Sequence, residues 1–274
     1  MSVKCPTIIA GPCAVESMEQ MRTIVPFLLS MKIQYIRAGA FKPRTSPDDF
    51  QGLGMEGLSI LEAVRREYSV KIVSEIVDIR HLERMCQCVD ILQVGARNMD
   101  NYELLKELGR SRVHVLLKRH MSATIAEFEK AAQYILQEGN PNLILCERGI
   151  RTFENATRNT LDLSCCALMK RRLDLPIIVD ISHSLGRKDI AAPMAKAALA
   201  AGADGLMIEV HQQPSIALSD AAQQMDFIEF EDFLQNIRSC WRYGGNFSAK
   251  YKLDTLFFTG QFVPEHHKLP SPRR

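Results

Sequence analysis

Eight short apolar runs recur along this chain, and amphipathic segments separate most of them. Several runs are continuously apolar rather than alternating, which is typical of strands that are buried on both faces of a parallel sheet. The runs are Thr7–Ala10, Gln34–Ala38, Lys71–Glu75, Ile91–Val94, Val113–Lys118, Leu143–Cys146, Pro176–Asp180 and Gly205–Glu209. Eight strands that alternate with helices within the first 240 residues favour an α/β fold of the closed (β/α)8 type, a TIM barrel. The alternative, an open doubly wound sheet, is disfavoured because no G-x-G-x-x-G follows the first run.

Five of the intervening segments have the apolar spacing of helices. They are the segment from Ser17 to about Met31, Leu53–Tyr68, Ala123–Gln137, Phe153–Arg171 and Arg187–Ala200. Serine is a preferred residue at a helix N-terminus, so Ser17 marks the start of the first helix. The sequence Ala-Gly-Ala-Asp-Gly at 201–205 predicts a helix end that turns into a strand.

The 274 residues suit a single barrel, which typically needs ~250 residues. We predict the barrel over residues 1–240 and an irregular C-terminal extension over 241–274, where prolines and a Gly-Gly pair replace periodicity. Two interpretations of this extension stay open. It is either an extension without a docking role or a segment that docks, through its aromatic side chains, on a partner or a neighbouring subunit.

Composition narrows the class of protein. A net charge of +2 is too small to indicate nucleic-acid or membrane binding through the overall electric field. No stretch approaches the ~20 apolar residues of a membrane helix. The eight cysteines are scattered and form no pair of C-x-x-C motifs, so neither a disulfide framework nor a zinc ribbon is predicted. We therefore expect a cytoplasmic protein with reduced thiols and with no nucleic-acid or membrane partner.

Polar side chains follow the predicted strands at their carboxyl ends, which is where barrel enzymes carry their sites. Cations follow the second, fourth, fifth and sixth strands: Arg37, Lys42, Arg44, Arg97, Lys118, Arg119, Arg148 and Arg151. Cations that converge in one pocket repel one another unless an anion lies between them. A phosphate or carboxylate substrate is therefore predicted, because arginine binds such groups in a bidentate manner.

Metal-ligand types follow the first, seventh and eighth strands: Cys13, Asp180, His183, Glu209, His211 and Asp220. Taken singly, Cys13 is more often a small buried core residue and His183 more often a satisfied polar residue. Glu209 and Asp220 are ordinarily acidic loop residues. Together, Cys13, His183, Glu209 and Asp220 would supply one sulfur, one nitrogen and two carboxylate ligands. Such a mixed set suits Mn²⁺, Fe²⁺, Co²⁺ or Zn²⁺ better than Mg²⁺. Spacing alone leaves the metal site and the ordinary interpretation equally open.

At these residues the chain resembles a known family, over roughly residues 5–240. It is similar to the 3-deoxy-D-arabino-heptulosonate 7-phosphate (DAHP) synthases of the short type I (beta) group, in the family shared with the 3-deoxy-D-manno-octulosonate 8-phosphate (KDO8P) synthases. The matching segments are AGPCAVES (10–17), RAGAFKPRTSPDDFQGLG (37–54), QVGARNM (93–99), LLKR (116–119), LCERGIRTFE (145–154), VDISHSLGR (179–187) and MIEVHQQPSIALSDAAQQ (207–224).

The resemblance implies a (β/α)8 barrel that condenses phosphoenolpyruvate with erythrose 4-phosphate, the first step of the shikimate pathway to chorismate and the aromatic amino acids. It implies one divalent metal ion, held by Cys13, His183, Glu209 and Asp220. It also implies that phosphate and carboxylate groups of the two substrates are bound by Arg37, Lys42, Arg44, Thr45, Arg97, Lys118 and Arg148. Lys42 and Glu75 are the candidates for proton transfer, and Asp180 is the candidate acceptor behind His183.

Two other functions are weighed against this one. A KDO8P synthase would use arabinose 5-phosphate, but its motif resembles K-A-N-R-S, whereas this chain has Lys-Pro-Arg-Thr at 42–45. A catalytically silent scaffold barrel would be expected to have lost some of the ligands. The resemblance further suggests a homotetramer or homodimer, no appended regulatory domain, and a separate chorismate mutase as a candidate partner. His120 departs from the small residue expected after Lys118-Arg119.

Overall fold

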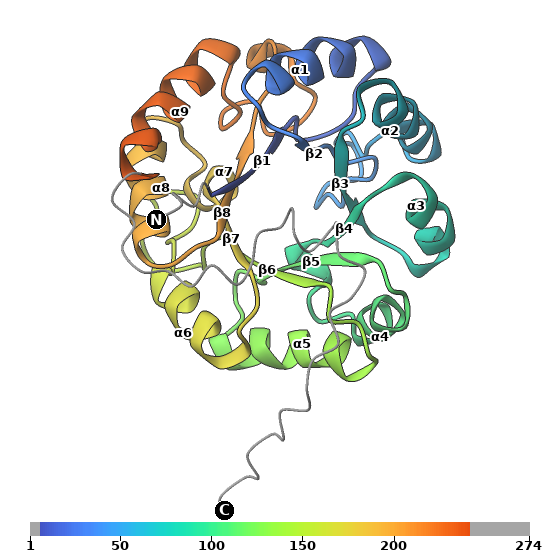
Figure 1. Ribbon diagram of the computed structural model, residues 1–274, viewed down its shortest axis with the longest axis vertical. Coiled ribbons are helices and arrows are strands. Elements are labelled where there is room, and N and C mark those ends of the chain that lie inside the picture. Colours follow the sequence, from blue (N-terminus) through green and yellow to red (C-terminus); the bar gives the residue numbers. More distant parts are fainter. Residues whose placement is uncertain (1–5, 242–274) are drawn as a thin grey trace, which may run out of the picture.

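The computed structural model describes residues 6–241, and within them eight parallel strands pair in sequential order and close into a barrel. Figure 1 looks into this barrel, with the strands at the centre and the helices forming an outer ring. The strands are β1 (Thr7–Gly11), β2 (Tyr35–Arg37), β3 (Lys71–Ile76), β4 (Ile91–Val94), β5 (His114–Lys118), β6 (Leu143–Glu147), β7 (Ile177–Asp180) and β8 (Gly205–Glu209). The predicted (β/α)8 fold is confirmed, and every predicted strand is found within one or two residues of its expected bounds.

The strands are apolar throughout because both of their faces are buried. One face of each strand packs inside the barrel, where a separate cluster forms from Ile9, Tyr35, Val73, Ile91, Leu116, Ile144, Cys146, Ile178 and Met207. The neighbouring residues, such as Ile8 and Ala10 on either side of Ile9, face the helices and belong to the outer core. Side chains fill the barrel interior, so any site must lie at an end of the barrel rather than along its axis.

Helices cover the outside of the barrel. They are α1 (Met18–Ser30), α2 (Met55–Tyr68), α3 (Leu82–Cys88), α4 (Tyr102–Arg110), α5 (Ile125–Gln137), α6 (Leu163–Leu173), α7 (Ile181–Leu185), α8 (Ala191–Ala200) and α9 (Phe227–Trp241), with short 3₁₀ turns at Ile79–His81, Ala96–Asn98 and Pro214–Ile216. The hydroxyl of Ser17 accepts from the Gln20 N–H at 3.0 Å, which confirms the predicted start of the first helix. The helices α3, α4, α7 and α9 were not predicted from the sequence.

One predicted helix is wrong over its first half. The segment Phe153–Arg171 was expected to be helical throughout, but α6 begins only at Leu163. The preceding ten residues form a loop because their side chains bond to the backbone in place of helical partners. The Glu154 carboxylate accepts from the N–H groups of Asn155 and Ala156, both at 2.8 Å. The Asp162 carboxylate then caps the true start of α6 by accepting from the Cys165 N–H at 3.2 Å.

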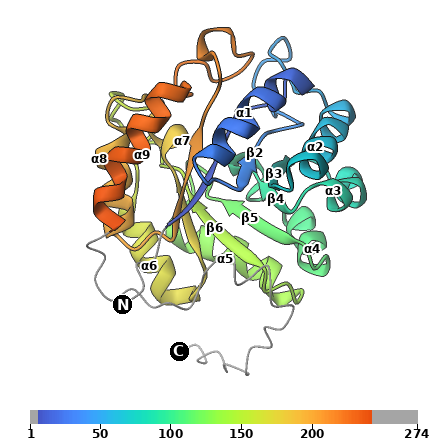
Figure 2. The same cartoon turned by 45° about the horizontal axis from the view of Figure 1, so that its top comes forward.

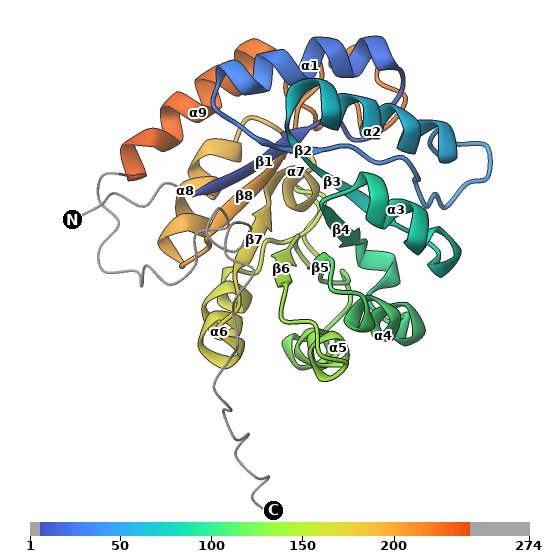
Figure 3. The same ribbon diagram turned by 45° about the vertical axis from the view of Figure 1, so that its right-hand side comes forward.

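Helix α9 closes the outer ring between α8 and α1, as Figure 3 shows. Its Phe227 ring stacks on Phe27 of α1 with ring centroids 3.9 Å apart. Trp241, the last described residue, lies beside the predicted barrel boundary at residue 240, and the predicted extension after it lies outside the described residues. No helix in residues 6–241 combines the length and apolarity that crossing a membrane requires.

The loops after the strands gather at the carboxyl end of the barrel. In Figure 2 the β2–α2 and β8–α9 connections rise from the same end of the molecule. The loops after β1 and β2 are tied by the bridge between Ala14 and Gly39, and the loop after β8 folds back through the bridge between Val210 and Met225. This end of the barrel therefore carries the candidate site.

Candidate active site

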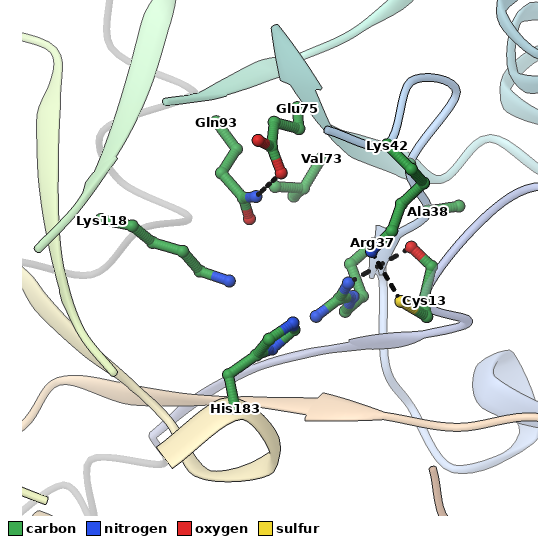
Figure 4. A pocket seen from close by; sticks show the side chains of 10 residues that line it. Cys13, Arg37, Ala38, Lys42, Val73, Glu75, Gln93, Lys118 and His183 are labelled. Atoms are coloured by element: carbon green, nitrogen blue, oxygen red, sulfur yellow. Dashed lines mark hydrogen bonds between the residues drawn. The ribbon is translucent and has the colours of Figure 1, made fainter. Parts of the chain in front are cut away.

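A small pocket opens at the carboxyl ends of the strands, and its empty space of about 330 Å³ includes solvent at the mouth. Its lining comes from β1 to β5 and α7 and consists of Cys13, Arg37, Ala38, Gly39, Lys42, Val73, Glu75, Gln93, Lys118 and His183. Figure 4 shows Lys118 and His183 pointing into this space from one side, with Lys42, Arg37 and Cys13 on the other side. Six residues proposed from the sequence thus meet in one place.

Three predicted metal ligands form a compact group at the edge of this pocket. The Sγ of Cys13 and carboxylate oxygens of Glu209 and Asp220 all lie within 4.8 Å of one another. The fourth candidate, His183, directs Nε2 toward the same group, 3.6 Å from Glu209 Oε1 and 3.7 Å from Asp220 Oδ2. The arrangement fits a divalent ion, because sulfur, nitrogen and carboxylate donors converge without large rearrangement.

The strand register brings these ligands together. Gly11 of β1 pairs with Glu209 of β8, so Cys13 lies just past the end of the strand that neighbours the glutamate. The backbone N–H of Cys13 donates to Gln224 Oε1 at 3.0 Å, which ties the β1 loop to the β8–α9 loop. Asp220 lies in that second loop with a φ of 50°, a left-handed conformation that aspartate tolerates better than most residues.

Each of the three side chains of this compact group is in contact with a cation. The Lys42 Nζ donates to Cys13 Sγ at 2.8 Å, and Arg37 Nη2 lies 3.0 Å from Glu209 Oε1. Asp220 Oδ1 accepts from Arg158 Nη1 at 3.3 Å. The thiol and the two carboxylates are therefore each in contact with a cation, and two of these cations, Arg37 and Lys42, face the pocket.

Burial and these charges set the protonation states. Burial, reinforced by the Glu209 carboxylate, raises the pKa of the Cys13 thiol, so an incoming metal ion has to displace its proton. Burial lowers the pKa of His183 despite the nearby carboxylate of Asp180, which keeps the imidazole in the neutral form that binds metals. Although burial alone would raise it, the pKa of Asp220 is held well below its usual range by His183 and Lys42.

His183 is oriented from behind by Asp180, the predicted acceptor. Asp180 Oδ2 lies 2.9 Å from His183 Nδ1, and Oδ1 accepts from the His183 backbone N–H at 3.0 Å. The same carboxylate pairs with Lys118 Nζ at 2.5 Å. A carboxylate behind a histidine fixes the ring orientation, so Nε2 is left to face the metal group.

Two buried arginines near the pocket, Arg148 and Arg37, have N–H groups without a hydrogen-bond partner within the described part of the chain. Arg148 Nη2 reaches the His183 carbonyl at 3.4 Å, but its Nη1 has no hydrogen-bond partner in residues 6–241. The same holds for Nε and Nη1 of Arg37. Burial lowers the pKa of Arg148, as expected for a cation without a matching anion. Such donors suit a bound phosphate or carboxylate.

Glu75, a proton-transfer candidate, lies across the pocket from the metal group. Its Oε2 accepts from Gln93 Nε2 at 3.2 Å. Its carboxyl group occupies the space where a side chain at position 95 would begin, since a Cβ on Gly95 would lie only 1.9 Å from Glu75 Oε1. The glycine of the QVGARNM segment therefore makes room for this carboxylate.

Four predicted substrate residues lie outside the pocket lining. One is Arg148, the buried arginine described above, and the other three are Arg44, Thr45 and Arg97. Arg44 pairs with Asp49 at 2.9 Å on the β2–α2 loop, where Thr45 is exposed. Arg97 is also exposed, but its Nη1 donates to the Pro43 carbonyl at 3.2 Å. The loop of residues 42–45 and the end of β4 are thus adjacent, at the rim rather than at the floor of the site.

Two strand-end residues considered in the sequence have other partners. Arg119 points away from the pocket and forms buried ion pairs with Glu147 at 2.9 Å and Asp162 at 2.8 Å. His211 is fully buried, with its Nε2 3.4 Å from Glu16 Oε2. Both therefore help to hold loops in place.

The structure also shows residues that the sequence did not single out. Gln223 Nε2 donates to Glu209 Oε2 at 2.6 Å, and Gln224 holds Cys13 as described above. Arg158 pairs with Asp220. The glutamines lie three and four positions after Asp220 in the chain, but nothing in residue type distinguishes them from surface glutamines. Only the fold brings Arg158 to Asp220, which lies 62 positions later in the sequence.

A closed (β/α)8 barrel with a cationic pocket and a Cys, His and carboxylate group at the carboxyl ends of its strands has the architecture of an enzyme that acts on anionic substrates. Comparison with known proteins identifies the family of this chain. The chain belongs to the DAHP synthetase I family, which matches residues 4–241.

Individual relatives agree with this assignment. A phospho-2-dehydro-3-deoxyheptonate aldolase from Thermotoga maritima is 47% identical over 232 residues, which cover 85% of this chain and 69% of that protein. A crystal structure of a T. maritima protein of this name, also called DAHP synthase, superposes with a TM-score of 0.81 at 45% identity, over 85% of this chain and 68% of that one. A 2-dehydro-3-deoxyphosphooctonate aldolase from Syntrophotalea carbinolica is 31% identical over 248 residues, covering 84% of this chain and 88% of its own.

Proposed function

We propose that this chain is a 3-deoxy-7-phosphoheptulonate (DAHP) synthase, which joins phosphoenolpyruvate to D-erythrose 4-phosphate and releases inorganic phosphate. The observation that carries this function is the meeting of the Cys13, Glu209 and Asp220 group with buried cations at one pocket. Family membership and the heptonate-forming relative at 47% identity support the same reaction.

Cys13, His183, Glu209 and Asp220 would hold one divalent ion. The sulfur donor favours Mn²⁺, Fe²⁺, Co²⁺ or Zn²⁺ over Mg²⁺. When bound, the ion would act as a Lewis acid on the aldehyde oxygen of the sugar phosphate. In the reaction, C3 of phosphoenolpyruvate forms a bond to the aldehyde carbon, water adds at C2, and phosphate leaves by cleavage of the C–O bond.

The cations of the chain would bind and orient phosphoenolpyruvate. Lys118 and Arg148 suit its phosphate, because both are buried beside His183 and Arg148 has an unpaired donor. Arg97 would add a contact from the rim. Arg37 and Lys42 would hold the carboxylate near the reacting carbon. Positioning of two phosphorylated substrates is a large contribution in such a reaction, since it converts a bimolecular step into an intramolecular one.

Lys42 and Glu75 would move protons. Lys42 lies between Cys13 Sγ at 2.8 Å and Asp220 Oδ2 at 3.8 Å, next to where the aldehyde oxygen would be protonated. Glu75 lines the pocket across from Lys42 and would accept a proton from the water that adds at C2.

The sugar is assigned through the loop of residues 42–45. Arg44 and Thr45 would bind the phosphate of erythrose 4-phosphate at the rim, after Arg44 exchanges its partner Asp49 for the substrate. The longer arabinose 5-phosphate would place its phosphate farther from this loop.

Three further proposals rest on sequence and resemblance. They are a homodimer or homotetramer, a separate chorismate mutase as partner, and the division into a barrel (1–240) and an extension (241–274).

A two-substrate comparison tests the assignment. With phosphoenolpyruvate and Mn²⁺ saturating, phosphate release and seven-carbon product should be measured with erythrose 4-phosphate and, in parallel, eight-carbon product with arabinose 5-phosphate. We expect kcat/KM to favour erythrose 4-phosphate by roughly 10-fold or more, because arabinose 5-phosphate carries an extra CH(OH) unit that the site would have to accommodate. Preference for arabinose 5-phosphate would assign the octulosonate reaction, and turnover of neither sugar would indicate a silent barrel.

A further inference from the structure

Arg158, the cation that pairs with Asp220, differs in position from the two cations that contact Cys13 and Glu209. Arg37 and Lys42 face the substrate pocket, whereas Arg158 approaches Asp220 from outside it. Arg158 comes from the β6–α6 loop, and 40% of its side chain is exposed. It lines a second, open hollow of about 1040 Å³ between the loops after β6, β7 and β8. A change at Arg158 therefore alters a contact of Asp220 while the residues that line the first pocket stay the same.

Arg158 is linked to two of the proposed ligands. Its Nη1 donates to Asp220 Oδ1 at 3.3 Å and to Gln223 Oε1 at 2.8 Å. The amide of Gln223 then donates to Glu209 Oε2 at 2.6 Å. Because Arg158 fixes the oxygen of this amide, the nitrogen is the atom that faces Glu209. The Arg158 guanidinium thus orients Asp220 directly and orients Glu209 through the Gln223 side chain.

The same loop also holds the third ligand. The Arg158 N–H donates to the Leu185 carbonyl and the Asn159 N–H to the Ser184 carbonyl, both at 2.8 Å. The Asn159 side chain donates to the carbonyl of His183 itself at 3.0 Å. These bonds attach the loop to the short helix α7, which presents the His183 ring.

Two glycines make this close approach possible. Gly186 has a φ of 66°, and a Cβ there would lie 2.6 Å from the Cβ of Arg158. A Cβ on Gly149 would lie 2.7 Å from the Cβ of Asn159. The absence of a side chain at Gly186 and Gly149 therefore leaves the space that Arg158 and Asn159 occupy.

We propose that Arg158 is a positioning residue, which with Gln223 and Asn159 holds Asp220, Glu209 and His183 in the geometry that binds the metal ion. This inference deepens the proposed function, because it rests on the metal site of that function. Partners behind metal ligands typically change metal affinity by about 10–100-fold when they are removed. We expect an effect of that size on the dissociation constant of the metal.

The test uses the full chain and Co²⁺ as the probe, with no substrate present. Arg158→Met removes the charge at similar length, Arg158→Lys restores a charge, and Gln223→Leu breaks the link to Glu209. The matched control is Arg187→Met. Arg187 lines the same hollow, pairs with Asp189 at 2.7 Å and donates to the Ala156 carbonyl of the same loop at 3.0 Å, but within residues 6–241 it contacts no proposed metal ligand. Competition with a chromophoric chelator gives the dissociation constant, and the thiolate-to-Co²⁺ absorption band reports binding to Cys13. Circular dichroism verifies that each variant is folded.

We expect Arg158→Met and Gln223→Leu each to raise the Co²⁺ dissociation constant by about 10–100-fold, with Arg158→Lys intermediate and Arg187→Met unchanged. The double variant should be no worse than the poorer single variant, since both changes break one chain of contacts. At saturating metal the KM for phosphoenolpyruvate should stay at the wild-type value.

A folded Arg158→Met protein that binds Co²⁺ as tightly as wild type would overturn the inference, as would a wild-type protein that binds no Co²⁺. A wild type that binds Co²⁺ but joins neither sugar to phosphoenolpyruvate would overturn only the proposed function.

Discussion

Replacing Cys13 with alanine is expected to lower kcat by about 10³-fold or more and to abolish tight metal binding. Polarisation of a carbonyl by a bound metal contributes several kcal/mol to transition-state stabilisation, and each ~1.4 kcal/mol corresponds to a tenfold change in rate. Cys13 supplies the sulfur of the group and also accepts the Lys42 hydrogen bond at 2.8 Å, so the variant loses a ligand and disturbs a proton-transfer candidate. Steady-state rates and metal content per chain measure the two effects.

Cys88→Ala is the matched control for this variant. Cys88 is also fully buried, but it lies in α3, where its thiol donates to the Arg84 carbonyl at 3.2 Å. The control should keep the wild-type kcat and metal content. A Cys13→Ala protein that turns over at a wild-type rate with bound metal would show that the sulfur is not a ligand.

Replacing Arg119 with methionine should destabilise the fold by about 3–5 kcal/mol, since removal of one partner leaves buried carboxylates without a counter-charge. The Arg119 side chain is 3% exposed and pairs with Glu147 at 2.9 Å and with Asp162 at 2.8 Å. Its guanidinium also donates to the Ala123 carbonyl at 3.1 and 2.9 Å, so the start of α5 and the start of α6 are both held by it. The midpoint of thermal unfolding should fall by roughly 6–20 °C.

Arg110→Met provides the comparison for an exposed arginine. Arg110 pairs with Glu138 and Glu107 on the surface, with 53% of its side chain exposed. Its loss should leave the midpoint of thermal unfolding nearly unchanged, because exposed ion pairs contribute little to stability. Equal denaturation midpoints for the Arg119 and Arg110 variants would contradict the structural role assigned to the buried cluster.

The strands were predictable because parallel strands buried on both faces leave an unambiguous apolar run in the sequence. The loop before α6 was not. Its apolar spacing resembles that of a helix, but the Glu154 carboxylate accepts from a nearby backbone N–H group within the loop. The Asp162 carboxylate caps the helix that follows, so α6 begins only at Leu163. Short helices such as α7 lack enough residues for a periodic signal.

The site was partly predictable for a related reason. Residues at strand ends, such as Cys13, Lys118 and Glu209, are placed by the barrel itself, so their convergence follows from the fold. The pattern of cations at strand ends did not by itself distinguish Lys118, which faces the pocket, from Arg119, which points away from it, because successive strand residues alternate between faces. The family resemblance was needed to assign only Lys118 to the substrate. Partners that act across loops, such as Arg158 with Asp220, have no local signal at all.

The most direct test of the central claim is a metal titration of the stripped enzyme. The protein is treated with a chelator, desalted, and given Mn²⁺ in steps while bound metal and seven-carbon product from phosphoenolpyruvate and erythrose 4-phosphate are measured together. We expect no product from the stripped protein and a linear recovery that ends at one bound ion per chain. Full product formation by the metal-free protein would contradict the account.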